Sequence, residues 1–364
     1  MPHIAALATG LLLFAADHPL RLWWLQLVAF LPFWWALAHR NQAGQHAWPL
    51  GTLLGLGYVA PMVAAAGTSP PILVAALANL VQWSITALLA ARALRRGPVL
   101  GPLAAAAVVT LVEVAVWYGV PMFGTAQCFV RPLSAAPGMV AFVAFTGVAG
   151  LVFVLTVTQA LLVSAWRSER RAPPLAIAGL VVAATTFASW LRWTRPLGPT
   201  TTVATVGWYG EWDRFFSGFD GIATEAKARG ATLLVTPETG ISTGHEPRER
   251  SLGRLGGIAR TNAFTLAAGV WHGSTNDNRI WFFGPDGALR GEYTKTHLIP
   301  WLEDYVAGDG TLFHGAIGDT SLGGMICQDD NFTDLARGYG RAGTRLVAVP
   351  TNDWPAIRAF HLEN

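Results

Sequence analysis

Long apolar segments separated by short polar breaks fill residues 1–199, and they constrain the fold more than any other feature. A helix of about 20 mostly apolar residues crosses a bilayer, and somewhat shorter ones are tolerated. The whole chain is 52% hydrophobic and only 13% charged, whereas soluble domains carry about a quarter charged residues. We therefore predict a transmembrane domain of about seven helices, at residues 4–16, 22–38, 48–66, 72–91, 99–118, 138–165 and 175–193.

The charged residues divide the chain near residue 200. Residues 1–199 hold 11 arginines, no lysine and 3 acidic residues, whereas residues 200–364 hold 12 arginines, 2 lysines and 19 acidic residues. We therefore predict a second, polar domain over residues 200–364. No basic stripe with interleaved aromatic residues is present, so nucleic acid is not an expected partner.

The arginines of the polar breaks predict the orientation in the membrane. Basic residues concentrate on the cytoplasmic side of membrane proteins. Seven arginines follow the second, fourth and sixth segments: Arg40, Arg92, Arg95, Arg96, Arg167, Arg170 and Arg171. Four lie in the breaks on the opposite side: Arg21, Arg131, Arg192 and Arg195. This distribution predicts a cytoplasmic N-terminus and a polar domain on the periplasmic, extracytoplasmic side.

From Thr200 onward, β-branched and apolar runs alternate with helical segments and glycine turns. This alternation predicts an α/β domain. The predicted helices are Phe215–Arg229 and Ser251–Thr261. The predicted strands are Thr201–Trp208, Ala231–Val235, Thr265–Val270, Ile280–Phe283, Gly323–Ile326 and Leu346–Val349.

Three chemically informative residues lie at predicted strand ends or in the loops after them: Glu238, Lys295 and Cys327. A deprotonated cysteine is a strong nucleophile, a glutamate can take and return its proton, and an ammonium can stabilise an oxyanion. Together they supply the parts of covalent acyl transfer. Taken singly, each has a plain structural explanation, namely core packing for the cysteine, helix capping for the glutamate and a solvated surface for the lysine.

The segments that carry these residues resemble the carbon–nitrogen hydrolase (nitrilase) superfamily. They are Leu233-Leu-Val-Thr-Pro-Glu238, Tyr293-Thr-Lys295-Thr-His-Leu-Ile-Pro and Gly323-Gly-Met-Ile-Cys327-Gln-Asp329. With the apolar segments before them, the chain resembles the apolipoprotein N-acyltransferase family. The resemblance implies a four-layer αββα catalytic domain in which Glu238 is the base, Lys295 stabilises the oxyanion and Cys327 is the nucleophile. It also implies supporting roles for Glu303 and Asp329.

The sequence departs from the family pattern in three places. The family's usual Cys-Tyr-Glu is Cys327-Gln-Asp329 here, and its usual Phe-Gly-Glu-Tyr is Trp301-Leu-Glu303-Asp. Both changes keep the acid and alter its neighbours. The chain also ends at Asn364, before the last strands and the final membrane span that the family implies, so we expect a catalytic domain that is incomplete at its C-terminus.

Three functions remain open from the sequence. The first is transfer of an acyl chain from a membrane phospholipid, through a thioester on Cys327, to the amine of a diacylglyceryl lipoprotein. This function implies a bacterial inner-membrane protein. The second is a membrane-tethered amidase that uses water. The third is a non-catalytic, truncated relative.

Other polar residues of the chain predict little chemistry. The histidines are scattered without ligand spacing, so no metal or other cofactor is expected. Cys128 and Cys327 do not form a disulfide framework. Glu113 lies inside the fifth apolar segment, where a carboxyl group is costly and often functional. We favour a structural role for it, bonded to a neighbouring helix.

Overall fold

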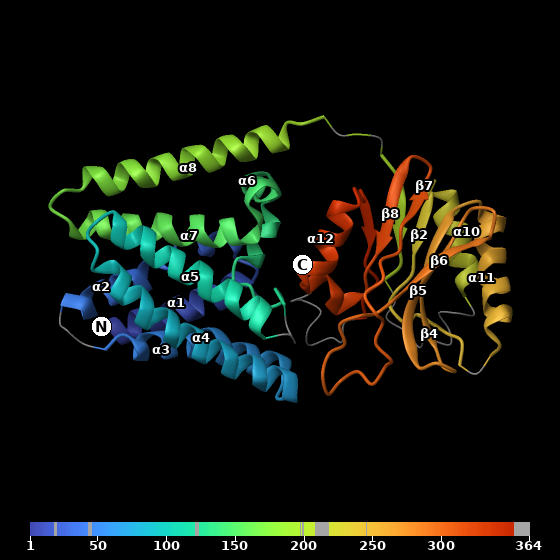
Figure 1. The fold of residues 1–364 in the computed structure, drawn as a ribbon, viewed down its shortest axis with the longest axis horizontal. Coiled ribbons are helices and arrows are strands. Elements are labelled where there is room, and N and C mark those ends of the chain that lie inside the picture. The colour runs from blue at the N-terminus through green and yellow to red at the C-terminus, as the bar shows by residue number, and fades with distance from the viewer. Residues whose placement is uncertain are drawn as a thin grey trace. The chain divides into compact units, whose positions relative to one another are not determined.

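The computed structural model describes residues 1–17, 20–42, 46–120, 124–196, 198, 200–207, 218–244 and 246–352, which divide into two units, Met1–Pro196 and Leu197–Asn352 (Figure 1). Parts of three expected elements lie outside these residues: Trp208 of the first strand, 215–217 of the first helix of the α/β domain, and 353–364 at the end of that domain.

The first unit is built from apolar helices. Within the described residues, five are long and apolar enough to cross a membrane: α3 (Trp48–Ala66), α4 (Pro70–Leu94), α5 (Leu100–Gly119), α7 (Val143–Arg167) and α8 (Ala172–Trp193). A shorter apolar helix, α1 (Pro2–Asp17), precedes them. The remaining elements are α2 (Leu31–Gln42), α6 (Pro137–Val140) and the 3₁₀ turns η1 (Trp23–Leu27) and η2 (Arg131–Ala135).

The expectation of one spanning helix over residues 22–38 is wrong. The chain forms the short η1 and then turns before α2 begins. Gln159 of α7 stabilises this break, because its amide oxygen accepts from the Phe30 N–H at 2.8 Å and its amide nitrogen donates to the Gln26 carbonyl at 2.9 Å. A break in a membrane helix is tolerated where neighbouring side chains satisfy the freed backbone groups.

The expected span over residues 138–165 is also divided. The short α6 ends before α7 starts, and Gly147 within α7 has a φ of 68°, which is outside the helical region. Ser189 of α8 bonds both sides of the break, accepting from the Phe142 N–H at 3.1 Å and donating to the Met139 carbonyl at 2.8 Å. A side chain from another helix again replaces the missing helical hydrogen bonds.

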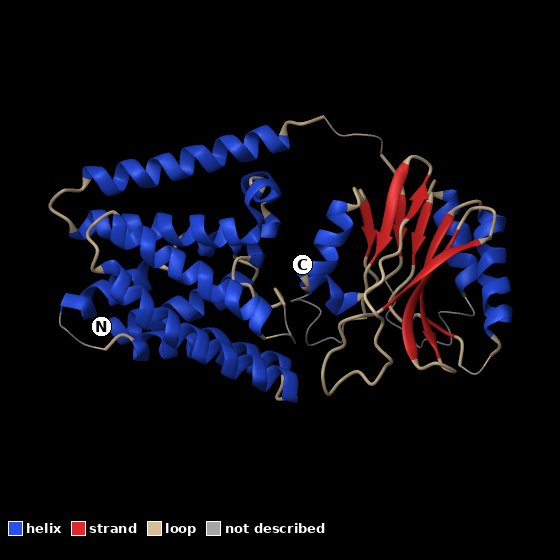
Figure 2. Cartoon of the chain, viewed as in Figure 1, coloured by secondary structure: helices blue, strands red, loops and turns tan. Residues whose placement is uncertain are grey.

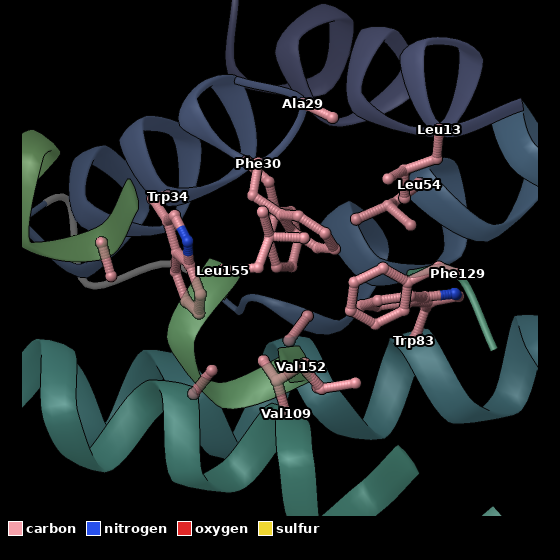
Figure 3. Packing of buried hydrophobic residues seen from close by; sticks show 14 of the residues in the cluster. Leu13, Ala29, Phe30, Trp34, Leu54, Trp83, Val109, Phe129, Val152 and Leu155 are labelled. Carbon is pink, nitrogen blue, oxygen red and sulfur yellow. The ribbon is translucent and has the colours of Figure 1, made fainter. Parts of the chain in front are cut away.

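Aromatic rings and close helix contacts hold the first unit together. Phe30, Trp83 and Phe129 pack with ring centroids 5.0 to 5.7 Å apart (Figure 3). A Cβ atom added to Gly10 of α1 would overlap the Leu54 carbonyl of α3, so these two helices approach as closely as small residues permit. Buried Glu113 accepts a hydrogen bond from Gln82 of the neighbouring α4.

The second unit contains two sheets. The larger has the order β1 (Val203–Thr205), β2 (Leu233–Val235), β4 (Thr265–His272), β5 (Asp277–Phe283) and β6 (Leu289–Thr294), and β3 (Ile241–Ser242) also pairs with β4. Strands β1, β2 and β4 are parallel, while β5 is antiparallel to both β4 and β6. The smaller sheet has the order β7 (Gly315–Ile317), β8 (Thr320–Gly324) and β9 (Leu346–Ala348).

These sheets form the two inner layers of a four-layer domain (Figure 2). Side chains alternate between the faces of a strand. Leu234 and Leu266 accordingly pack with α10 (Phe219–Ala228) and α11 (Arg248–Asn262). Their neighbours in sequence, Leu233 and Ala267, face the opposite way and pack on the smaller sheet. Helix α12 (Thr333–Arg341) lies against the other face of that sheet. The expected fold class, apolar membrane helices followed by an αββα nitrilase-like domain, is confirmed.

Candidate active site

The sequence-predicted residues lie just after strand ends of the second unit. Glu238 follows β2, Lys295 follows β6 and Cys327 follows β8. Since β2 and β6 both run parallel to β4, their carboxyl ends lie on one edge of the larger sheet. Loops at that edge carry the functional groups of α/β folds. Cys327 comes from the facing smaller sheet and opens the 3₁₀ turn η3 (Cys327–Asn331).

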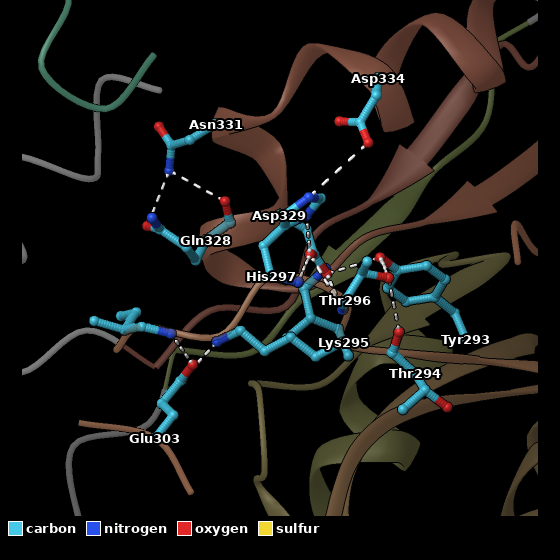
Figure 4. A network of polar contacts seen from close by, with 12 residues as sticks. Tyr293, Thr294, Lys295, Thr296, His297, Glu303, Gln328, Asp329, Asn331 and Asp334 are labelled. Carbon is cyan, nitrogen blue, oxygen red and sulfur yellow. Dashed lines mark hydrogen bonds and ion pairs between the residues drawn. The ribbon is translucent and has the colours of Figure 1, made fainter. Parts of the chain in front are cut away.

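Lys295 lies in a buried polar cluster, and Figure 4 shows its contact with Glu303. Its side chain is fully buried, and its Nζ donates to Glu238 Oε1 at 2.8 Å and to Glu303 Oε1 at 2.6 Å. Glu238 Oε1 also accepts from Asn278 Nδ2 at 2.7 Å. The structure thus brings Glu238, Lys295 and Glu303 into direct contact. Asn278 was missed by the sequence analysis.

The electrostatics keep Lys295 protonated. Burial disfavours the ammonium, but the charges of Glu238, Cys327 and Glu303 outweigh this effect and raise the pKa of Lys295 above its usual value. The pKa of the Glu303 carboxyl is raised by burial, and the charge of Lys295 partly offsets that rise. Lys295 is therefore a fixed positive charge rather than a base, and it lies close enough to Cys327 for a thiolate there to stabilise its ammonium.

Cys327 occupies an unusual backbone conformation. Its φ is 45°, in the left-handed region, and Thr239, which follows Glu238, has a φ of 50°. Such conformations cost on the order of 1–3 kcal/mol in residues other than glycine, and they cluster at active sites. Residues after β9 hold the backbone at these two places. The Cys327 N–H donates to the Pro350 carbonyl at 2.9 Å, and the N–H of Glu238, which precedes Thr239, donates to the Thr351 carbonyl at 3.4 Å.

Asp329 organises the backbone around the site instead of joining the Lys295 cluster. Its carboxylate is fully buried and accepts from the His297 N–H at 2.7 Å, from His297 Nδ1 at 3.0 Å and from the Tyr293 hydroxyl at 2.8 Å. It also accepts from the Ile326 N–H at 3.3 Å. Asp329 therefore links the chain beside Lys295 to the chain beside Cys327.

His297 carries the clearest signal that the sequence analysis left unused. It lies two residues after Lys295, and its ring stacks on Phe332 with centroids 3.7 Å apart. Metal-ligand spacing says nothing about a histidine ring that binds a carboxylate. In the described part of the chain, no group of three His, Cys, Asp or Glu side chains could hold a metal ion. Both cysteines are free thiols.

Comparison with solved structures found amidases. An amidase from Nesterenkonia sp. matches with 23% sequence identity and a TM-score of 0.40, covering 44% of this chain and 70% of the amidase. The NitN amidase of strain AN1 matches with 22% identity and a TM-score of 0.39, covering 45% of this chain and 72% of the amidase.

Comparison with curated proteins and family models covers both units. An apolipoprotein N-acyltransferase from Geobacter metallireducens is 28% identical over 160 residues, which is 37% of this chain. The matched stretch spans 31% of that relative's length. Residues 9–161 match the model of the apolipoprotein N-acyltransferase N-terminal domain, and residues 201–361 match that of carbon-nitrogen hydrolases. The apolar helices indicate an integral membrane protein, and the two family models together support an N-acyltransferase of the nitrilase superfamily.

Proposed function

We propose that the protein moves an acyl chain from a membrane phospholipid to the N-terminal amine of a diacylglyceryl-cysteine lipoprotein, by way of a thioester on Cys327. The observation that carries the proposal is the buried ammonium of Lys295, held between Glu238 and Glu303 and close enough to Cys327 to interact with its thiolate form. The helical unit supports it, because both substrates are lipids that reach the site from the bilayer.

In the first half-reaction, Glu238 takes the thiol proton of Cys327, and the sulfur attacks an ester carbonyl of the phospholipid. The oxyanion that forms is stabilised by the ammonium of Lys295 and by the backbone N–H of Gln328. When the tetrahedral intermediate collapses, the ester C–O bond breaks. The lysophospholipid alkoxide leaves with the proton from Glu238, and the acyl group remains on sulfur as a thioester.

In the second half-reaction, the lipoprotein amine attacks the thioester carbonyl. Glu238 accepts the proton that the amine loses, the same donors stabilise the second oxyanion, and the C–S bond breaks. The cysteine sulfur regains its proton, and the product is an amide. Lys295 serves both halves because it stays protonated, and Glu303 fixes its position through the 2.6 Å ion pair.

Acyl labelling of the protein tests this assignment. Full-length protein in phospholipid vesicles is incubated with phospholipid that carries a radiolabelled acyl chain, without acceptor. We expect label on the protein that neutral hydroxylamine releases, as a thioester requires. The matched variants are Cys327→Ala and Cys128→Ala, which each remove one of the chain's two thiols. Only Cys327→Ala should abolish labelling, and equal labelling of both variants would refute the assignment.

The second candidate is an amidase that uses water as the acyl acceptor. It is favoured by the match of residues 201–361 to carbon-nitrogen hydrolases and by the changed neighbours of Cys327 and Glu303. Product analysis separates the two functions. An acyltransferase given a diacylglyceryl peptide forms its N-acyl amide, whereas an amidase releases free acid and leaves the peptide amine unmodified.

A further inference from the structure

A cavity of about 430 Å³ lies within the helical unit, between α2, the α4–α5 connection and the end of α7. Its size falls in the range of small-molecule sites, about 300–1,000 Å³. Its polar lining includes the arginines Arg95 and Arg167 and the serines Ser164 and Ser168, and none of the described residues that line it is acidic. The cavity therefore favours an anion.

Both arginines also have a structural role at the ends of helices. Arg95 directly follows α4 and Arg167 ends α7. Cations at such positions stabilise the carbonyl ends of helices. That role does not account for a cavity between the two residues, and the N-terminal end of α5, which begins at Leu100 beside the cavity, instead favours a negative charge.

A buried hydrogen-bond donor provides the independent observation. Trp34 lines the cavity, is 1% exposed, and its indole N–H, like those of Trp83 and Trp117, has no hydrogen-bond partner among the described residues. Of these three, only Trp34 lines the cavity. Figure 3 shows Trp34 at the end of the aromatic cluster away from Trp83 and Phe129. Buried indole N–H groups usually find an acceptor. An oxyanion in the cavity would supply one.

An apolar groove of about 490 Å³ adjoins this cavity and shares Val163 of α7 with it. Trp35, Leu162 and Trp166 line it together with α1 and the start of α2. Residues of the α4–α5 connection and of the end of α7 line the cavity, at the end of the unit where the α4–α5 and α7–α8 connections emerge (Figure 1). Connections between membrane-spanning helices emerge among the lipid headgroups. A basic cavity beside an apolar groove fits a molecule with an anionic head and a hydrocarbon chain.

We infer that the helical unit holds one anionic phospholipid, with its phosphate between Arg95, Arg167 and the Trp34 indole N–H and one acyl chain in the adjoining groove. None of the residues proposed for catalysis lines either space. We assign this lipid as a bound structural partner of the helical unit. The site stands whether or not the proposed acyl transfer is correct.

Native mass spectrometry of the full-length protein in a neutral detergent tests the site, with phosphatidylglycerol as the probe. We expect one phosphatidylglycerol to remain bound, and its dissociation constant to rise at least about tenfold in Arg95→Gln/Arg167→Gln. The matched control is Arg92→Gln/Arg170→Gln, which removes the same charge from exposed arginines outside the cavity. Trp34→Phe keeps the packed ring, removes the N–H and should weaken binding several-fold.

Three outcomes would overturn the inference. Equal weakening in the two double variants would show general attraction to a basic surface. Competition by a diacylglycerol of the same chains as strong as by phosphatidylglycerol would show that the phosphate is not recognised. Displacement of the lipid by inorganic phosphate at equal concentration would assign the cavity to free phosphate. Melting temperatures of the variants within about 2 °C of the wild type show that loss of binding is not loss of folding.

Discussion

Lys295 is a buried ammonium between two carboxylates, so we expect its replacement to destabilise the folded protein. Replacement of one partner in a buried ion pair leaves the remaining charges unpaired, at a cost of about 3–5 kcal/mol. Lys295→Met should therefore lower the free energy of unfolding of the catalytic unit strongly at pH 7. Because the folded pKa of Lys295 lies above that of an unfolded lysine, about 10.4, its stabilisation is complete below that value and is lost as the pH rises through the folded pKa.

The measurement is thermal unfolding of the detergent-solubilised protein between pH 7 and pH 11. The gap in melting temperature between the wild type and Lys295→Met should be widest near neutrality and narrow above about pH 10.4. Lys227, the chain's other lysine, is exposed on α10 and gives the matched control. Lys227→Met should unfold like the wild type across the range. A pH-independent gap for Lys295→Met would contradict the ion-pair explanation.

Among single residues, the sequence predicted Glu238, Glu303 and Lys295 as site residues. It did not predict the backbone contacts that hold the site in place. Lys295 was identifiable because lysine is rare in this arginine-biased chain, Glu238 because it lies just after a predicted strand, and Glu303 through the family resemblance. The carbonyls of Pro350 and Thr351, which fix the backbone of Cys327 and Glu238, are backbone groups that every residue carries. A contact of that kind leaves no trace in residue type, so only the folded chain reveals it.

The two interrupted helices of the membrane unit show that hydropathy predicts which segments are buried in lipid but not whether their backbone is continuous. A window of apolar residues indicates burial in lipid, and residues 22–38 are apolar throughout most of their length. Whether the backbone is continuous depends on distant partners, and Gln159 lies 129 positions after Phe30, whose N–H it accepts. The register between α7 and this turn is set by tertiary packing, so the pattern of the segment alone could not locate the break.

Gln159→Leu tests this account of the break. The substitution keeps the bulk of the side chain and leaves the Phe30 N–H and the Gln26 carbonyl buried without partners. We expect it to cost about 1–3 kcal/mol for each group, measured as a lower melting temperature in detergent. Thr158→Val is the matched control, because it removes a hydrogen bond that Thr158 makes only within α7. Equal melting temperatures for the two variants would mean that Gln159 does not hold the turn.

The distribution of arginine across the whole chain predicts which way the molecule lies in the membrane. The last turns of α2, α4 and α7 and the connections after them carry seven of the eleven arginines of the helical unit, whereas the second unit is rich in acidic residues. Basic connections are retained in the cytoplasm. We therefore propose that the catalytic unit faces the periplasm of the inner membrane, where a lipoprotein amine is presented.

Cysteine accessibility in intact cells tests this orientation. Cys128 and Cys327 are both buried, and alanine at both positions gives a thiol-free chain for reporter cysteines. A cysteine at Arg229, on the exposed surface of the catalytic unit, should react with a membrane-impermeant maleimide added outside cells with a permeable outer membrane. A cysteine at Arg96, exposed after α4, should react only after the inner membrane is opened. The reverse labelling pattern would place the Lys295 cluster in the cytoplasm, away from an extracytoplasmic acceptor. It would contradict the orientation predicted from the arginines.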